Sequence, residues 1–92
     1  MELNVGDFIR IKKSSNPGII VRKYNGDLVV SITEFEGDYI IVNENKGEYA
    51  NINPEEKLSI LSKFSEFFYE HHKELYQNII IENIIYHSEL TT

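Results

Sequence analysis

The residues best suited to chemistry cluster near position 71, where two adjacent histidines lie between glutamates. Glu70, His71, His72 and Glu74 carry side chains that bind metals or move protons. On a helix, adjacent side chains point about 100° apart, so His71 and His72 cannot chelate one ion together. The four-residue spacing that suits a helical site joins only glutamates, Glu66 to Glu70 and Glu70 to Glu74. We therefore expect no metal and no cofactor, with His71 on the apolar face of a helix and His72 at its edge.

Other arrangements that carry catalysis are no stronger. None of the seven serines has a nucleophile-elbow motif around it. The five glycines are single turn residues and form no phosphate-binding loop. Glu34 and Glu36 alternate beside a turn, which is typical of a solvated strand end. The sequence therefore predicts a protein that is not an enzyme.

Basic and aromatic residues interleave along two expected strands. Alternation directs five of them away from the apolar side: Phe8, Arg10, Lys12, Arg22 and Tyr24. Because basic side chains hold phosphates and aromatic rings stack on bases, this basic-aromatic face is a candidate nucleic-acid surface. The alternative is a solvated sheet face, with Phe8 covered by a loop or by the C-terminal helix.

The charge distribution favours a protein partner over nucleic acid. The net charge is −6, and neutralisation of phosphates supplies much of nucleic-acid affinity. Residues 1–33 hold five basic and three acidic side chains, whereas residues 34–92 hold twelve acidic side chains and four lysines. An acidic surface suited to a basic partner is predicted at Glu34, Glu36, Asp38, Glu44 and Glu48.

A hairpin over residues 17–32 organises the expected fold. Asn25-Gly26 between two apolar runs predicts a type I′ turn, which needs positive φ at both central residues. A two-residue loop places Tyr24 opposite Asp27 and Val21 opposite Val30. The aliphatic face, expected to form the core, then carries Ile19, Val21, Leu28, Val30 and Ile32.

Further strands are expected at residues 7–13, 38–44 and 48–52. Ile9 and Ile11 share the inner face of the first of them. Turns are expected at residues 36–38 and 45–47, where glycine stands among polar residues. Ile40, Ile41 and Val42 are consecutive, so the pattern does not assign the inner face of that strand.

Three stretches resemble the opening of an SH3-like small barrel of the KOW or Tudor-like type: VGDFIRI at 5–11, PGIIV at 17–21 and DLVV at 27–30. The resemblance covers roughly residues 3–61. It implies a barrel domain over residues 1–61, with about five or six antiparallel strands and a single-turn helix before the last one. Asn53 and Pro54 suit the start of a helix. Residues 54–61 are then a turn and a strand, which we favour, or the start of a longer helix.

From Ser62 the apolar spacing changes to three and four residues, which predicts an amphipathic helix. Residues 62–92 form a helical extension that packs on the barrel or on a partner. We expect helix to about His87, although isoleucines in 78–87 also suit a strand. The apolar side chains exceed what one side of a small barrel covers, which indicates self-association or a protein partner. The predicted interface comprises Phe64, Phe67, Phe68, Leu75, Tyr76, Ile80 and Ile84.

These patterns together predict a cytoplasmic, non-enzymatic protein-binding module. The chain has no cysteine, no basic-then-apolar leader and no apolar run long enough for a membrane span. A homodimer through the C-terminal helix is expected. Small size and acidity suit an inhibitor or adaptor, of phage-encoded or immunity type, acting on a nucleic-acid-handling enzyme. The alternative is a KOW-like protein that binds nucleic acid, or the transcription or translation machinery, through the basic-aromatic face.

Overall fold

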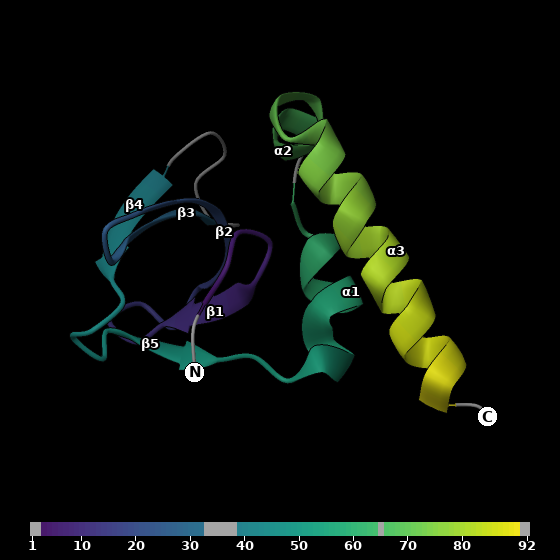
Figure 1. Ribbon diagram of the computed structural model, residues 1–92, viewed down its shortest axis with the longest axis horizontal. Coiled ribbons are helices and arrows are strands. Elements are labelled where there is room, and N and C mark those ends of the chain that lie inside the picture. The colour runs from purple at the N-terminus through teal and green to yellow at the C-terminus, as the bar shows by residue number, and fades with distance from the viewer. Residues whose placement is uncertain (1–2, 33–38, 65, 91–92) are drawn as a thin grey trace.

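The protein is an antiparallel sheet that curls around an apolar interior and carries helices on one side (Figure 1). The computed structural model describes residues 3–32, 39–64 and 66–90. The strands are β1 (Phe8–Ile11), β2 (Pro17–Tyr24), β3 (Asp27–Ile32), β4 (Tyr39–Asn43) and β5 (Tyr49–Asn51). The helices are η1 (Pro54–Glu56, a 3-10 turn), α1 (Lys57–Leu61), α2 (Glu66–His71) and α3 (Lys73–Leu90). The turn expected at 36–38 lies outside the described residues.

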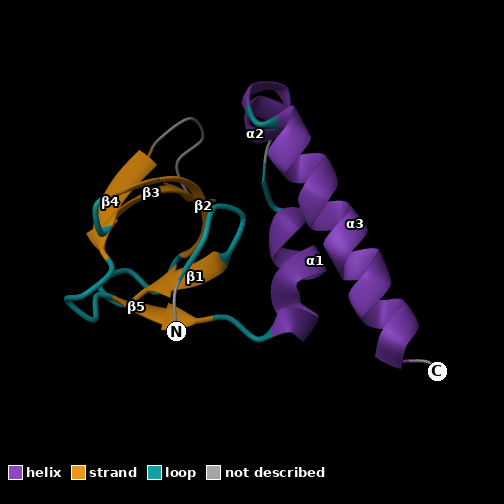
Figure 2. Ribbon diagram, in the orientation of Figure 1, coloured by secondary structure: helices purple, strands orange, loops and turns teal. Residues whose placement is uncertain are grey.

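The five strands pair in the order β4-β3-β2-β1-β5, and every pairing is antiparallel. A β-rich fold followed by helix is therefore confirmed. The sheet wraps around its inner face (Figure 2), but its two edge strands, β4 and β5, do not pair with each other in the described ranges. The described sheet is thus open along one side.

The hairpin confirms the predicted turn and corrects the register beyond it. Asn25 and Gly26 have φ of 44° and 92°, as a type I′ turn requires. Pairing next to the turn is as predicted, but a β-bulge at Val21 shifts the remainder by one residue. Ile20, rather than Val21, therefore lies opposite Val30. No turn or breaker residue marks the bulge in the sequence.

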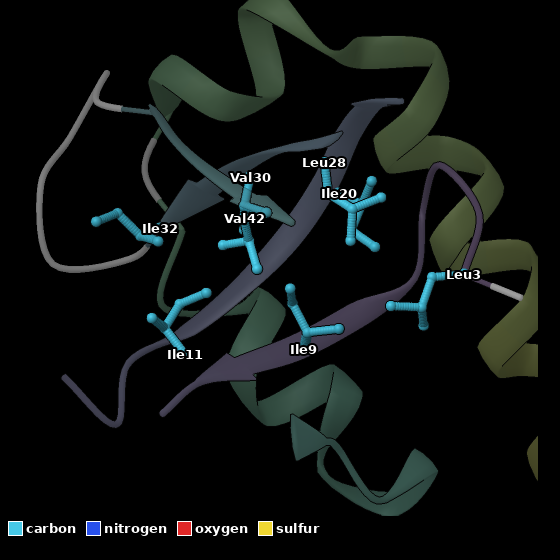
Figure 3. Close-up of a cluster of buried hydrophobic side chains, with 8 residues drawn as sticks. All are labelled: Leu3, Ile9, Ile11, Ile20, Leu28, Val30, Ile32 and Val42. Atoms are coloured by element: carbon cyan, nitrogen blue, oxygen red, sulfur yellow. The ribbon is translucent and has the colours of Figure 1, made fainter. Parts of the chain in front are cut away.

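The sheet is buried on both faces, so the prediction of a single aliphatic face was wrong. The bulge shifts the register and thereby changes which face each β2 side chain joins. An inner cluster (Figure 3) contains Leu3, Ile9, Ile11, Ile20, Leu28, Val30, Ile32 and Val42. An outer cluster, between the sheet and the helices, contains Phe8, Ile19, Val21, Ile52, Ile60, Leu61, Phe68 and Ile79. Ile19 and Val21 thus leave the face that carries Leu28. The helices give these two side chains a second apolar layer to pack against.

Residues 54–61 are helical, so the favoured turn-and-strand interpretation was wrong. The predicted cap is present: Oδ1 of Asn53 accepts a hydrogen bond from the Glu55 backbone N–H at 3.1 Å. Ile60 and Leu61 are both buried in the outer cluster. Consecutive side chains can share one side of a helix, whereas a strand would point them to opposite faces.

The C-terminal segment is helical through residues 78–87, as predicted, but it bends at His72 and is not one helix from residue 62. Backbone hydrogen bonds continue through the bend, from His72 N–H to the Phe68 carbonyl and from Tyr76 N–H to the His72 carbonyl, both at 2.8 Å. The bend lets Phe68 of α2 and Ile79 of α3 reach the same outer cluster. Among the described helices, none has both the length and the apolar character needed to cross a bilayer.

Candidate functional site

The strongest candidate site is an apolar stripe along the solvent side of α3. Ile81, Ile84 and Ile85 have exposed fractions of 54%, 63% and 53%. At 100° per residue these three side chains lie on one side of the helix. The opposite side is committed to the fold, because Ile79 and Asn83 are buried there, at 2% and 4% exposed. The stripe is therefore surplus apolar surface rather than unfinished core.

A shallow pocket continues the α3 stripe toward the bend. It has a volume of about 420 Å³ and is lined by Tyr69, Tyr76, Gln77, Ile80 and Ile81. The rings of Tyr69 and Tyr76 meet edge to face, with centroids 5.1 Å apart and planes at 90°. Ile81 belongs to both the pocket and the stripe. Stripe and pocket together offer one continuous apolar surface with tyrosine at one end.

The predicted interface coincides with this surface only in part. Phe68 is 2% exposed and lies in the outer cluster, where its ring packs against Phe64 at 4.9 Å between centroids. Phe64, Leu75, Tyr76 and Ile80 are partly buried against the same cluster. Among the predicted residues whose side chains are described, Ile84 is the exposed one, at 63%. The Phe67 side chain is not among them.

The predicted interface omits Ile81, Ile85 and Tyr69, which are exposed on this surface. The spacing of the helix identifies which residues share a side. Which side packs on the sheet depends on the bend at His72, and no glycine or proline marks that bend.

A second surface lies on the outer face of β2, β3 and β4. Nη1 of Arg22 donates a hydrogen bond to the Tyr24 hydroxyl at 3.0 Å. The Tyr39 hydroxyl and Nε2 of His72 are hydrogen-bonded at 2.7 Å, which joins β4 to the helix bend. Val21, Arg22, Val29, Tyr39 and His72 line a pocket of about 280 Å³. The structure thus brings the predicted Arg22 and Tyr24 together.

The electrostatics of this second surface favour a neutral histidine beside a fixed cation. Burial lowers the pKa of His72, and the positive charges of His71 and Arg22 lower it further. The hydrogen bond from Arg22 to Tyr24 raises the pKa of that guanidinium, which stays charged. The Nε2 of a neutral imidazole can accept a hydrogen bond from the Tyr39 hydroxyl, so His72 suits a structural contact between sheet and helix.

The helices divide the predicted basic-aromatic face. Phe8 is 4% exposed, and the Lys57 ammonium lies 5.7 Å from its ring centroid, so this ring is not available for stacking on a base. Nη1 of Arg10 donates to the Ser15 carbonyl at 2.8 Å, and its Nη2 lies 3.9 Å from Glu56. Lys12 is exposed near the end of β1. The cover over Phe8 thus separates the Arg10 end from Arg22 and Tyr24.

The predicted acidic surface lies largely outside the described residues, which omit Glu34, Glu36 and Asp38. Glu44 is half-buried and forms an ion pair with Lys23, its Oε2 lying 3.3 Å from Nζ. Nζ of Lys23 also donates to the Leu3 carbonyl at 2.8 Å. Glu48 is exposed. Glu44 is therefore held in an ion pair and is not a freely presented charge.

Over the described ranges, no three histidine, cysteine or acidic side chains gather as metal ligands would. No protein-family model, curated protein or solved structure matches this chain.

Proposed function

We propose that this chain is a non-enzymatic protein-binding module and that the apolar stripe of α3 is its main contact surface. The observation that carries the proposal is the exposure of Ile81, Ile84 and Ile85, each more than half accessible, on one side of a helix that packs on the fold through another side. A helix presented in this way binds a groove or a second helix through apolar side chains at turn spacing.

A second copy of the chain fits this stripe. Gln77, Ile81, Ile84 and Ser88 follow one line along α3, at successive spacings of four, three and four residues. This line carries no charged side chain, so two acidic chains can pack along it without placing carboxylates against each other. An antiparallel pairing about a two-fold axis gives both copies the same contacts.

Sedimentation equilibrium on the full chain tests this proposal. The variant Ile84→Glu places a charge at the centre of the stripe, and we expect it to be monomeric where the wild type is dimeric. The matched control is Leu58→Glu on α1, since Leu58 is 38% exposed but lies off the stripe. This control should dimerise as the wild type does.

Two results would count against the proposal. A wild type that stays monomeric at every concentration excludes a second copy as the occupant of the stripe. If Ile84→Glu also leaves unchanged every protein captured from the source cell, the stripe is not the contact surface.

The finer fold assignment that we propose is an open SH3-like barrel. The strand order β4-β3-β2-β1-β5 and a continuous inner cluster support it. The inhibitor or adaptor role that we infer rests on the net charge of −6 and on the exposed Glu48.

A nucleic-acid role is the second candidate, and the pairing of Arg22 with Tyr24 favours it. Tyr24 is 53% exposed and Tyr39 is 40% exposed on the same sheet face. Titration with RNA and DNA at two salt concentrations tests this role, because phosphate contacts make binding salt-dependent. Binding that Arg22→Glu abolishes would support it, and the absence of salt-sensitive binding would exclude it.

A further inference from the structure

The open side of the sheet contains a groove between β4 and the end of β1. The groove has a volume of about 580 Å³ and is lined by Ile11, Lys12, Lys13, Ile40, Ile41, Val42 and Glu48. We propose that this groove binds an extended acidic peptide, which adds to the free edge of β4 as a further strand. The site is separate from the α3 stripe and does not depend on it.

The free edge of β4 presents backbone groups that an added strand could pair with. The Glu44 N–H donates to the Gly26 carbonyl at 2.8 Å. Directly opposed residues in an antiparallel pair alternate between bonded and non-bonded positions. The register Val29 opposite Ile41 therefore falls in a non-bonded position, which turns the N–H and C=O of Ile41 away from β3. No described residue takes up these two groups.

The walls of the groove are apolar where a strand would lie. Val42 is 3% exposed and Ile11 is 7% exposed, and both belong to the inner cluster against which Ile40 packs. Residues of an added strand alternate between the two sheet faces. Every second side chain of the peptide would therefore enter the groove and extend the inner cluster.

The rim of the groove selects for acidic side chains. Lys12 and Lys13 are both exposed, and no described residue forms an ion pair with either ammonium. Glu48 is the one carboxylate among the lining residues, so the lining carries a net positive charge. Carboxylates on the outward side of the peptide would lie near these lysines, which complements their charge.

The exposure of Ile41 gives independent support. Its side chain is 71% exposed on an edge strand, the most exposed large apolar side chain among the described residues. Proteins commonly protect such edges with charge, proline or a covering segment. Here the strand has an accessible backbone and an apolar side chain together, which is the arrangement that strand addition uses.

A fluorescent peptide of sequence Glu-Val-Glu-Val-Glu-Val, titrated against the full chain by fluorescence anisotropy, tests the proposal. Two control peptides isolate the chemistry: Lys-Val-Lys-Val-Lys-Val reverses the charge, and a Glu-Val peptide with N-methyl groups at alternate residues cannot pair with an edge. We expect the first peptide to bind, more weakly at high salt, and both controls to fail. Hydrogen exchange at the Ile41 amide should slow only with the binding peptide.

Protein variants locate the site. Ile41→Pro removes an outward N–H without touching the bonds to β3, and we expect about fivefold weaker binding. Its matched control, Ile41→Thr, keeps the N–H and should bind as the wild type does. Lys12→Glu combined with Lys13→Glu should reduce binding by about tenfold or more; it alters exposed side chains and keeps the test valid if Ile41→Pro fails to fold.

Several outcomes would overturn the proposal. The first is that the acidic peptide does not bind at about 1 mM, where even a weak complex forms. The second is that the basic peptide binds as tightly as the acidic peptide. The third is that hydrogen exchange at the Ile41 amide does not change when the acidic peptide is added. Groove variants that change the self-association of the chain while no peptide binds would assign the edge to a second copy instead.

Discussion

The sequence predicts that Phe68 lies in an interface, whereas the structure buries it in the outer cluster. As an interface residue it would matter for association, whereas as a core residue it matters for folding. It is 2% exposed and contacts Phe64 and His72, with ring centroids 4.9 Å and 5.1 Å away. The variant Phe68→Ala removes a buried ring from the outer cluster, which lies between the sheet and the helices.

The expected loss is large relative to the whole stability. Phenylalanine-to-alanine changes at buried sites cost about 3–5 kcal/mol, including the cavity that remains. A chain of this size has a total stability of about 5–15 kcal/mol. Since 1 kcal/mol shifts the melting temperature of such a domain by roughly 4–8 °C, we expect a fall of at least about 12 °C.

Urea unfolding followed by circular dichroism and by tyrosine fluorescence measures this loss. The control is Leu58→Ala, whose side chain is 38% exposed and lies off the α3 stripe, and whose unfolding free energy should change by less than about 0.5 kcal/mol. A loss below about 1 kcal/mol for Phe68→Ala would refute the shared core between sheet and helices. So would separate transitions by the two probes, because one core should unfold cooperatively.

Three further predictions concern local features. Asn53→Ala removes the cap on the Glu55 N–H and should cost about 1 kcal/mol in urea unfolding, whereas Asn53→Ser should retain most of the stability. Gly18→Ala places a Cβ against the Val30 side chain, so we expect a loss of about 1–3 kcal/mol by the same assay; an unchanged midpoint would contradict the close approach of β2 to β3. The folded pKa of His72 lies below its unfolded value near 6.5. The contribution of neutral His72 to folding stability is therefore fully present above pH 6.5, and it is lost as pH falls through the folded pKa. His72→Gln should weaken that part of the pH dependence, and an identical profile would contradict it.

The sequence predicted turns and helix caps correctly where a few neighbouring residues determine them. The turn at Asn25-Gly26 and the cap at Asn53 are as predicted, because each depends on a few adjacent residues. Helix through residues 78–87 was also favoured correctly, since apolar spacing outweighed the strand preference of isoleucine.

The strand register, and the sheet face that each side chain joins, could not be predicted from neighbouring residues. Ile19, Ile20 and Val21 are consecutive and all buried, so no alternation marks the face that each one joins. The bulge at Val21 resolves this arrangement, because it places Ile19 and Val21 in the outer cluster, where they pack with helices that begin more than thirty residues further along the chain. The candidate surface on α3 has the same origin, since the bend at His72 decides which isoleucines remain exposed.

The two halves of the outer cluster are synthesised at different times, the strand residues first and the helical residues later. Phe8, Ile19 and Val21 leave the ribosome well before Ile60, Phe68 and Ile79, which are helical residues of the same cluster. The outer face of β1 and β2 is therefore not fully covered until residues 60–79 have emerged. Because exposed apolar surface makes incompletely folded chains prone to aggregation, we expect a chain that ends before residue 68 to aggregate more readily than the full chain.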